Sequence, residues 1–254
     1  MKLVSWNVNG IRAAAKKTFF DYLEEEAPDI LCIQETKARE DQLDETLLTP
    51  GGYYTYWHSG AKRGYSGVAT FSKQRPLNVR SGTELIPMDT EGRVLRTDFS
   101  DFLLYNIYFP NGGRGKDRLD FKLDFYEQAL HHFEQERRNG IPLVICGDVN
   151  TAHKEIDLKH PKQNENTSGF MPVERAWLDK LVALGYVDTF RHFHPDDVDQ
   201  YSWWDMRTRA RARNVGWRID YFFVTPEFLP RCRDASIQMQ ILGSDHAPVT
   251  LELK

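Results

Sequence analysis

Cysteine is scarce in this sequence, and long apolar runs are missing. The chain has only three cysteines, Cys32, Cys146 and Cys232, and no Cys-x-x-Cys pair. A disulfide framework is therefore excluded, and a reducing compartment is expected. No segment reaches the roughly 18 apolar residues of a membrane span, and the N-terminus MKLVSWNVNG turns polar too early for a signal peptide. We expect a cytoplasmic protein that does not bind membranes.

Linkers, internal repeats and low-complexity tracts are also missing. Hydrophobic residues make up 41% of the chain and aromatic residues 13%, and because they are spread along its length, extended disorder is excluded. A length of 254 residues fits one large domain or two small ones. The lack of a linker favours a single domain over residues 1–254, which we expect to be a monomer.

Several common catalytic motifs are missing as well. No His-Glu-x-x-His motif is present, and the cysteines and histidines lack zinc-site spacing. Residues 64–67 (GYSG) lack the spacing of a Gly-x-Ser-x-Gly motif, and residues 112–116 (GGRGK) lack the upstream glycine of a phosphate-binding P-loop. Residues 148–150 lack the glycine of a calcium loop.

Hydrophobic patterning predicts alternating strands and helices. Runs rich in β-branched and aromatic residues predict buried strands at residues 3–8, 29–34, 103–109, 142–148 and 217–224. Helical spacing of apolar residues predicts helices at residues 116–139, between Gly10 and Pro28, and at 173–184. Consecutive strands with antiparallel pairing are expected at residues 66–73, 76–81 and 93–108. The pattern predicts an α/β fold with two sheets sandwiched between helices.

Polar side chains stand where the predicted strands end. Five of them end a strand or interrupt one: Asn7, Glu35, Asp148, Asn150 and Asp220. In α/β sheets, ligands bind at the rim where strand ends and loops converge. If the final strand, at residues 247–253, runs antiparallel to the others, Asp245 and His246 before it lie at the same rim. All seven residues can then share one cleft.

Each of these residues also has a structural explanation. Asn and Asp at strand ends are common turn formers or helix caps, and Glu35 fits an exposed charge. Asp220 is harder to explain in this way, because a carboxylate within an apolar strand needs a partner. The coincidence of several such residues, rather than any one of them, favours a functional cleft.

The expected cluster offers mainly oxygen ligands, which suit Mg²⁺ or Mn²⁺. Glu35 and Asp245 are enough for a magnesium ion that keeps several waters, and Asp148 on the same rim can hold a water. Asp220 can pair with His246 and fix the tautomer and charge of the imidazole. Together these groups predict hydrolysis of a phosphate ester.

Positive charge is concentrated in residues 201–222, although the net charge of the chain is −4. This segment carries three tryptophans and five arginines: Trp203, Trp204, Trp217, Arg207, Arg209, Arg211, Arg213 and Arg218. Arginines neutralise phosphates and aromatic rings stack on bases and sugars, so the segment predicts nucleic-acid binding. A solvated charged face beside core tryptophans is the alternative. Further basic residues could extend the surface: Arg12, Lys62, Arg63, Arg114 and Lys116.

The motifs along the chain, taken in order, resemble one known family. The blocks are SWNVNGIRA, DILCIQETK, GYSGVATFS, EGRV, NIYFPNGGRG, ICGDVNTAHKEIDL, SGFMPVERAW, YSWW, RNVGWRIDYF and GSDHAPV. They resemble the exodeoxyribonuclease III family of abasic-site (AP) endonucleases, in the endonuclease/exonuclease/phosphatase superfamily. The resemblance implies a four-layer α/β sandwich and a metal-dependent DNA repair nuclease, which in a prokaryote would be associated with the nucleoid. Such an enzyme hydrolyses the phosphodiester 5′ to abasic sites in duplex DNA, with 3′→5′ exonuclease and 3′-phosphodiesterase activity expected as well.

The resemblance also implies roles for individual residues. Glu35 would be the main ligand of Mg²⁺, for which Mn²⁺ could substitute, with Asn7 and Asp245 close by. Asp148 would orient and deprotonate the attacking water, and Asn150 would help to place that water or the phosphate.

Further implied roles concern the transition state and the DNA. Asp220 and His246 would stabilise the pentavalent phosphorus. The implied DNA contacts are Tyr108 and Asn111 at the scissile phosphate, Trp203 and Trp217 around a flipped-out abasic sugar, Arg114 and Arg207 in the duplex, and Tyr65 and Arg12 elsewhere on the DNA.

Several alternatives stay open. Asn9 is an Asp in some relatives, and a neutral amide weakens a second metal site, so one metal or two are possible. Residues 160–167 also differ from the Asn-rich segment common in the family. A phosphodiesterase or phosphatase of the same superfamily, acting on a non-DNA phosphate ester, is the alternative function. A non-catalytic DNA-binding relative is disfavoured, because every expected catalytic position is filled.

Overall fold

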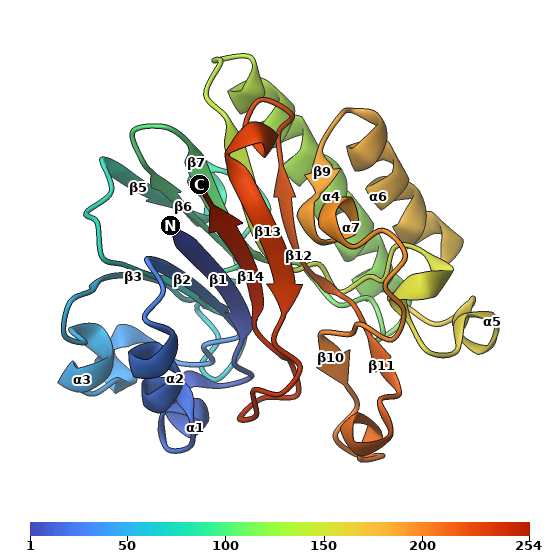
Figure 1. Ribbon diagram of the computed structural model, residues 1–254, viewed down its shortest axis with the longest axis horizontal. Helices are drawn as coiled ribbons and strands as arrows, with labels where there is room; N and C mark the ends of the chain where they lie inside the picture. The colour runs from blue at the N-terminus through green and yellow to red at the C-terminus, as the bar shows by residue number, and fades with distance from the viewer.

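Two six-stranded β-sheets form the centre of the computed structural model, which describes residues 1–254 (Figure 1). The first has the order β13-β14-β1-β2-β4-β3, with strands β1 (Lys2–Asn7), β2 (Ile30–Gln34), β3 (Tyr54–His58), β4 (Val68–Ser72), β13 (Cys232–Ile237) and β14 (Val249–Leu253). The second has the order β5-β6-β7-β8-β12-β9, with strands β5 (Asn78–Ser81), β6 (Val94–Asp98), β7 (Leu103–Tyr108), β8 (Leu143–Asp148), β9 (Val187–Asp188) and β12 (Asp220–Val224). A small third sheet pairs β10 (Trp203–Trp204) with β11 (Gly216–Trp217).

Helices cover the outer face of each sheet, which makes four layers (Figure 1). The helices are α1 (Ile11–Ala15), α2 (Phe19–Glu26), α3 (Glu45–Leu48), α4 (Lys116–Arg137), α5 (Pro161–Asn164), α6 (Pro172–Ala183) and α7 (Thr189–Phe193). Neighbouring residues of a strand point to opposite faces, so Cys32 packs between the sheets while Ile33 packs toward α1 and α2. The predicted four-layer α/β sandwich is confirmed. No helix is long and apolar enough to cross a bilayer.

Strand direction brings the predicted polar residues to one rim. β1 and β2 are parallel, and β14 runs antiparallel to β1, as predicted for the final strand. In the second sheet β12 runs antiparallel to β8, which places Asp220 opposite Asp148. The carboxyl ends of β1, β2 and β8 and the amino ends of β12 and β14 therefore meet on one side of the molecule.

Three expectations about individual elements need correction. The helix predicted between Gly10 and Pro28 is two helices, because the chain turns at residues 16–18 and Thr18 Oγ1 donates to the carbonyl of Leu242 at 2.7 Å. Strands β4 and β5 do not pair, because the chain crosses there from the first sheet to the second; β5, β6 and β7 are antiparallel as expected. Asp220 begins β12 rather than interrupting it, since the preceding backbone is bonded to Ser202 Oγ.

Candidate active site

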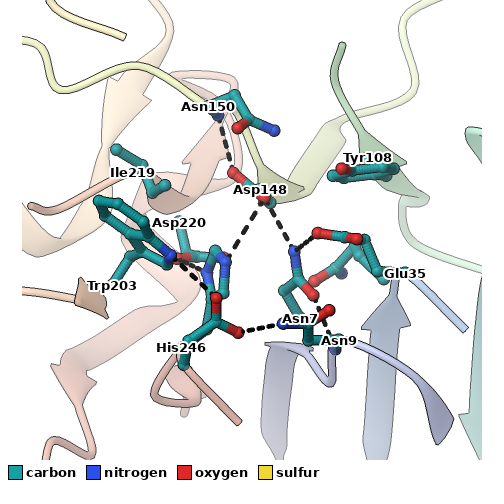
Figure 2. Close-up of polar contacts among 12 residues, drawn as sticks. Asn7, Asn9, Glu35, Tyr108, Asp148, Asn150, Trp203, Ile219, Asp220 and His246 are labelled. Carbon is teal, nitrogen blue, oxygen red and sulfur yellow. Dashed lines mark hydrogen bonds and ion pairs between the residues drawn. The ribbon is translucent and has the colours of Figure 1, made fainter. Parts of the chain in front are cut away.

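Asn7 lies between two carboxylates at the rim (Figure 2). Its Nδ2 donates to Glu35 Oε1 and to Asp148 Oδ2, both at 2.9 Å. The other oxygen of Asp148 accepts the backbone N–H of Asn150 at 2.8 Å, and Asn150 Nδ2 donates to the carbonyl of Phe109 at 2.9 Å. Because Asp148 and Asn150 are buried, these bonds hold the Asp148 carboxylate in one orientation.

A histidine–aspartate pair adjoins Asp148. His246 Nδ1 lies 2.8 Å from Asp220 Oδ2, and His246 Nε2 lies 3.9 Å from Asp148 Oδ2. Burial alone would lower the pKa of His246, but the nearby carboxylates, above all Asp220, raise it to about 10. Burial and repulsion by Asp220 raise the pKa of Asp148 to about 8. The site thus holds an imidazolium cation beside a carboxyl group poised to exchange a proton near neutral pH.

Carboxylates outnumber cations at this rim. Glu35 and Asp148 place carboxylate oxygens within 4.8 Å of each other, and Oδ1 of the buried Asp220 has no hydrogen-bond partner. Carboxylate and amide oxygens are the donors that hard divalent cations prefer. Excess negative charge and this donor set together fit a bound metal ion.

A lysine that did not stand out in the sequence also enters the site. Lys37 Nζ lies 2.7 Å from Glu35 Oε2 and contacts Asn9 Oδ1, and Asn9 Nδ2 donates to Asp245 Oδ1 at 2.8 Å. Asn9, Glu35 and Lys37 have φ angles of 47°, 50° and 50°. This left-handed conformation is unfavourable for residues other than glycine and is concentrated at functional sites.

The rim opens into a cleft of about 450 Å³. One wall is largely apolar, because Trp203 and Trp217 meet edge to face, with ring centroids 6.3 Å apart, beside Ile219. Trp203 Nε1 donates to Asp245 Oδ2 at 3.1 Å, which ties this wall to the polar cluster. Gly169 completes the wall at φ 100°, and a Cβ there would lie only 3.2 Å from the Trp217 ring.

The opposite wall is cationic. The buried Arg93 guanidinium lies 4.6 Å from the centroid of the Tyr108 ring and donates to the Tyr65 hydroxyl at 2.9 Å. Arg118 donates to the same hydroxyl at 2.9 Å, and Glu91 pairs with both arginines. Neither arginine was predicted, because each reaches the cleft only through the fold.

Most residues predicted for the site line this cleft: Glu35, Tyr65, Tyr108, Asn111, Arg114, Asp148, Asn150, Trp203, Arg207, Trp217, Asp245 and His246. Asn7 and Asp220 lie directly behind it, through their bonds to Asp148 and His246. Arg12 does not line it; this exposed residue borders a neighbouring groove with Lys16 and Lys37. The structure therefore gathers the predicted residues, and their chemical roles stay predictions.

The arginine-rich segment does not face one surface, which corrects the expectation that it binds nucleic acid as a unit. Arg218 is buried and pairs with Asp157 at 2.8 Å and Asp188 at 2.7 Å. Arg211 lies 4.4 Å from the centroid of the Trp204 ring, and its guanidinium donates to three backbone carbonyls of residues 239–244. Among the five arginines of the segment, Arg207 alone lines the cleft.

Comparison with known proteins places the chain in a family. The profile of the Endonuclease/Exonuclease/phosphatase family matches residues 4–246. An exodeoxyribonuclease of Bacillus subtilis (strain 168) is 47% identical over 252 residues, which are 99% of this chain and 98% of that protein. The DNA repair nuclease APEX1 of Danio rerio is 43% identical over 258 residues, covering 100% of this chain and 82% of that protein. An AP endonuclease structure from Archaeoglobus fulgidus matches with a TM-score of 0.91 and 30% identity, over 100% of this chain and 99% of that one. The chain belongs to the Endonuclease/Exonuclease/phosphatase family and, within it, to the group of exodeoxyribonucleases and AP endonucleases that its ordered motifs predicted.

Proposed function

We propose that this enzyme repairs DNA by hydrolysing the phosphodiester bond 5′ to abasic sites in the duplex. The observation that carries the proposal is the position of the Asp148–His246 cluster, between an apolar wall and a cationic wall of one cleft. An exodeoxyribonuclease, a DNA repair nuclease and an AP endonuclease among its relatives support a DNA substrate. The lack of a linker in the sequence supports a single domain over residues 1–254, and we propose that it acts as a monomer.

Shape supplies the selectivity in this proposal. The Trp203–Trp217 wall offers a small apolar surface to a deoxyribose without a base, and such a nucleotide flips out of the duplex more easily than an intact one. Gly169 approaches the Trp217 ring closely, so a larger residue at this position would push against the ring and disturb the apolar wall. Arg114 and Arg207, on the same cleft, meet the DNA backbone or enter the duplex.

Asp148 acts as the general base toward the attacking water. Its raised pKa brings proton affinity close to working pH, and Asn7 and the Asn150 amide hold its two oxygens in place. His246, held as a cation by Asp220, offsets the charge that develops on the non-bridging phosphate oxygens.

Tyr108 and Asn111 hold the scissile phosphate. Burial raises the pKa of Tyr108 well above its ordinary value, so its hydroxyl remains protonated and can donate to a phosphate oxygen. Asn111 Nδ2 donates to Asn150 Oδ1 at 2.9 Å, which links the phosphate contact to the water-placing residue.

Magnesium is the proposed metal, with manganese as a substitute, held by Glu35 with Asn7 and Asp245 nearby. When bound, the ion neutralises the phosphate and stabilises the leaving 3′-oxygen. Recessed 3′ ends and 3′-blocking groups also present a phosphoester of a 3′-oxygen to the cleft. We therefore propose 3′→5′ exonuclease and 3′-phosphodiesterase activities as well.

The test is a product gel on end-labelled duplexes that carry an abasic site, a recessed 3′ end or neither, with a phosphoinositide assayed in parallel. We expect magnesium-dependent incision 5′ to the abasic site, leaving a 3′-hydroxyl, and an intact phosphoinositide. Preferential hydrolysis of the phosphoinositide would reject DNA repair in favour of a different phosphoester substrate.

A further inference from the structure

A fully buried ion pair lies behind the cleft and is used by none of the steps above. Lys122 of α4 and Glu174 of α6 have no exposed side-chain surface, and Lys122 Nζ lies 2.6 Å from Glu174 Oε1. The ammonium also donates to the carbonyl of Asn150 at 2.8 Å and to Thr151 Oγ1 at 2.7 Å. All three ammonium hydrogens thus have partners. Burying two charges is costly, and apolar side chains of similar size would stabilise the helix contact at least as well.

Glu174 holds the edge of the cleft from the other side of the pair. Its Oε2 accepts the backbone N–H of Gly169 at 2.7 Å and of Met171 at 3.1 Å, and its Oε1 accepts the Ser168 hydroxyl at 2.9 Å. Residues 167–169 line the cleft, and Gly169 packs against the Trp217 ring. One buried carboxylate therefore determines where the rim of the sugar pocket lies.

Lys122 holds the segment that carries Asp148 and Asn150. Asn150 has a left-handed φ of 57°, a conformation that asparagine adopts more readily than most residues, and its carbonyl accepts the Lys122 ammonium. The same segment orients Asp148 through the Asn150 N–H. A second link joins the two sides, because the Ala152 N–H donates to the carbonyl of Gly169 at 2.8 Å.

We propose that Lys122 and Glu174 are positioning residues that keep Asn150 and the cleft edge at residues 167–169 at a fixed separation. The water held by Asp148 and the sugar pocket at Trp217 then keep a fixed distance from each other. The proposal rests on the proposed function, since it concerns the alignment of a phosphoester with Asp148. Neither residue lines the cleft, and both act through groups that do.

The test compares two ion pairs that join the same helices. In the first variant, Lys122→Met with Glu174→Gln, both buried charges are removed together, which limits the loss of stability. The control, Lys180→Met with Glu127→Gln, removes an exposed pair between α6 and α4 that does not contact the cleft. We expect kcat to fall about 100-fold in the first variant, because misplacement of reacting groups has effects of that size, with an unfolding temperature close to wild type. The control should keep both values.

Ser168→Ala provides a milder measurement that does not disturb the buried charges. It removes one bond between Glu174 and the rim, so we expect a higher KM with kcat nearly unchanged, a split that a general loss of stability does not produce. The proposal is overturned if the double variant folds and keeps wild-type kcat, or if the control variant loses as much kcat. If the double variant does not fold, an unchanged KM in Ser168→Ala overturns it.

All rates are measured on an abasic duplex and on a duplex with a 3′-phosphate end. If the wild type cleaves only the second substrate, the abasic-site function fails. The ratio of variant to wild-type kcat on that substrate then still decides whether Lys122 and Glu174 position the site.

Discussion

Two groups of charged residues, most of them buried, differ in their balance of positive and negative charge. We call the first the structural cluster: Asp157, Asp188, Arg191 and Arg218. The second is the rim cluster: Glu35, Asp148, Asp220, Asp245 and His246. Burial would raise the pKa of Asp157, but Arg218 and Arg191 lower it to about 2. For Asp148, burial and a neighbouring carboxylate act in the same direction and raise the pKa to about 8.

The comparison indicates that the balance of nearby charges, more than burial, sets the direction of the pKa shift of a buried aspartate. Asp157 is contacted by two guanidiniums, at 2.8 Å and 2.7 Å. In the rim cluster one imidazole and the ammonium of Lys37 face four carboxylates, and an oxygen of Asp220 has no partner. A cluster with paired charges stabilises the fold, and a cluster with excess negative charge can bind a metal and accept a proton.

The largest expected effect comes from removing one carboxylate of the rim cluster, that of Asp148. Asp148→Asn should lower kcat by about 10³-fold, because a general base contributes on the order of 10² to 10⁴ to the rate. The free energy of unfolding should not decrease, since the variant removes a buried carboxylate that repels its neighbours. Single-turnover cleavage of an abasic duplex and urea unfolding measure the two quantities. Near wild-type cleavage would remove Asp148 from the proposed mechanism.

A substitution in the structural cluster should lower stability and leave activity nearly unchanged, the opposite of what is expected for Asp148→Asn. Arg218→Met leaves Asp157 and Asp188 short of a partner and should lower the free energy of unfolding by about 3–5 kcal/mol, the range for breaking a buried ion pair. Activity per folded molecule should change little, because the Arg218 guanidinium bonds only to Asp157 and Asp188, neither of which lines the cleft. Urea unfolding and active-site titration test this prediction, and a stable but inactive variant would contradict it.

Acid should weaken the structural cluster in a defined pH range. Asp157 titrates at about pH 2 in the folded chain and at about 3.9 when unfolded. Its folded pKa is lowered, so its contribution of about 2.5 kcal/mol is complete above pH 4 and is lost as the pH falls toward 2. Unfolding free energies measured between pH 5 and 2 should therefore fall less steeply in Asp157→Asn than in wild type. Parallel slopes would show that the ion pairs do not lower this pKa.

The difference between the clusters also explains what could be predicted from the sequence. The rim cluster was predictable because strand ends converge at one rim, a rule that needs only strand positions and directions. The partner of Arg218 was not, because Asp157 lies 61 residues earlier and is brought close by the fold. Arg218 therefore looked like part of a DNA-binding segment.

Elsewhere, local patterns predicted elements well and connections poorly. Helix α4 has nearly the predicted bounds, since its apolar spacing is regular. The crossing from β4 to β5 left no local pattern, because each strand looks alike in either sheet. One available signal was missed: Lys122 lies between Leu119 and Tyr126 at helical spacing, a charge on an apolar face.

The smallest expected effect tests whether the presence or absence of a charged partner also separates the roles of arginines at the surface. Arg207 is exposed, lines the cleft and forms no ion pair, whereas Arg231 pairs with Asp101 at 3.1 Å before β13, at the far end of the first sheet. If an unpaired arginine is available for a phosphate, Arg207→Ala should reduce the slope of log affinity against log salt by about one, while Arg231→Ala should leave it unchanged. Fluorescence anisotropy with an abasic duplex measures both slopes, in an Asp148→Asn background so that the DNA stays intact. Equal slopes in all three proteins would mean that Arg207 meets no phosphate, and that the lack of a carboxylate partner does not identify a DNA contact on this surface.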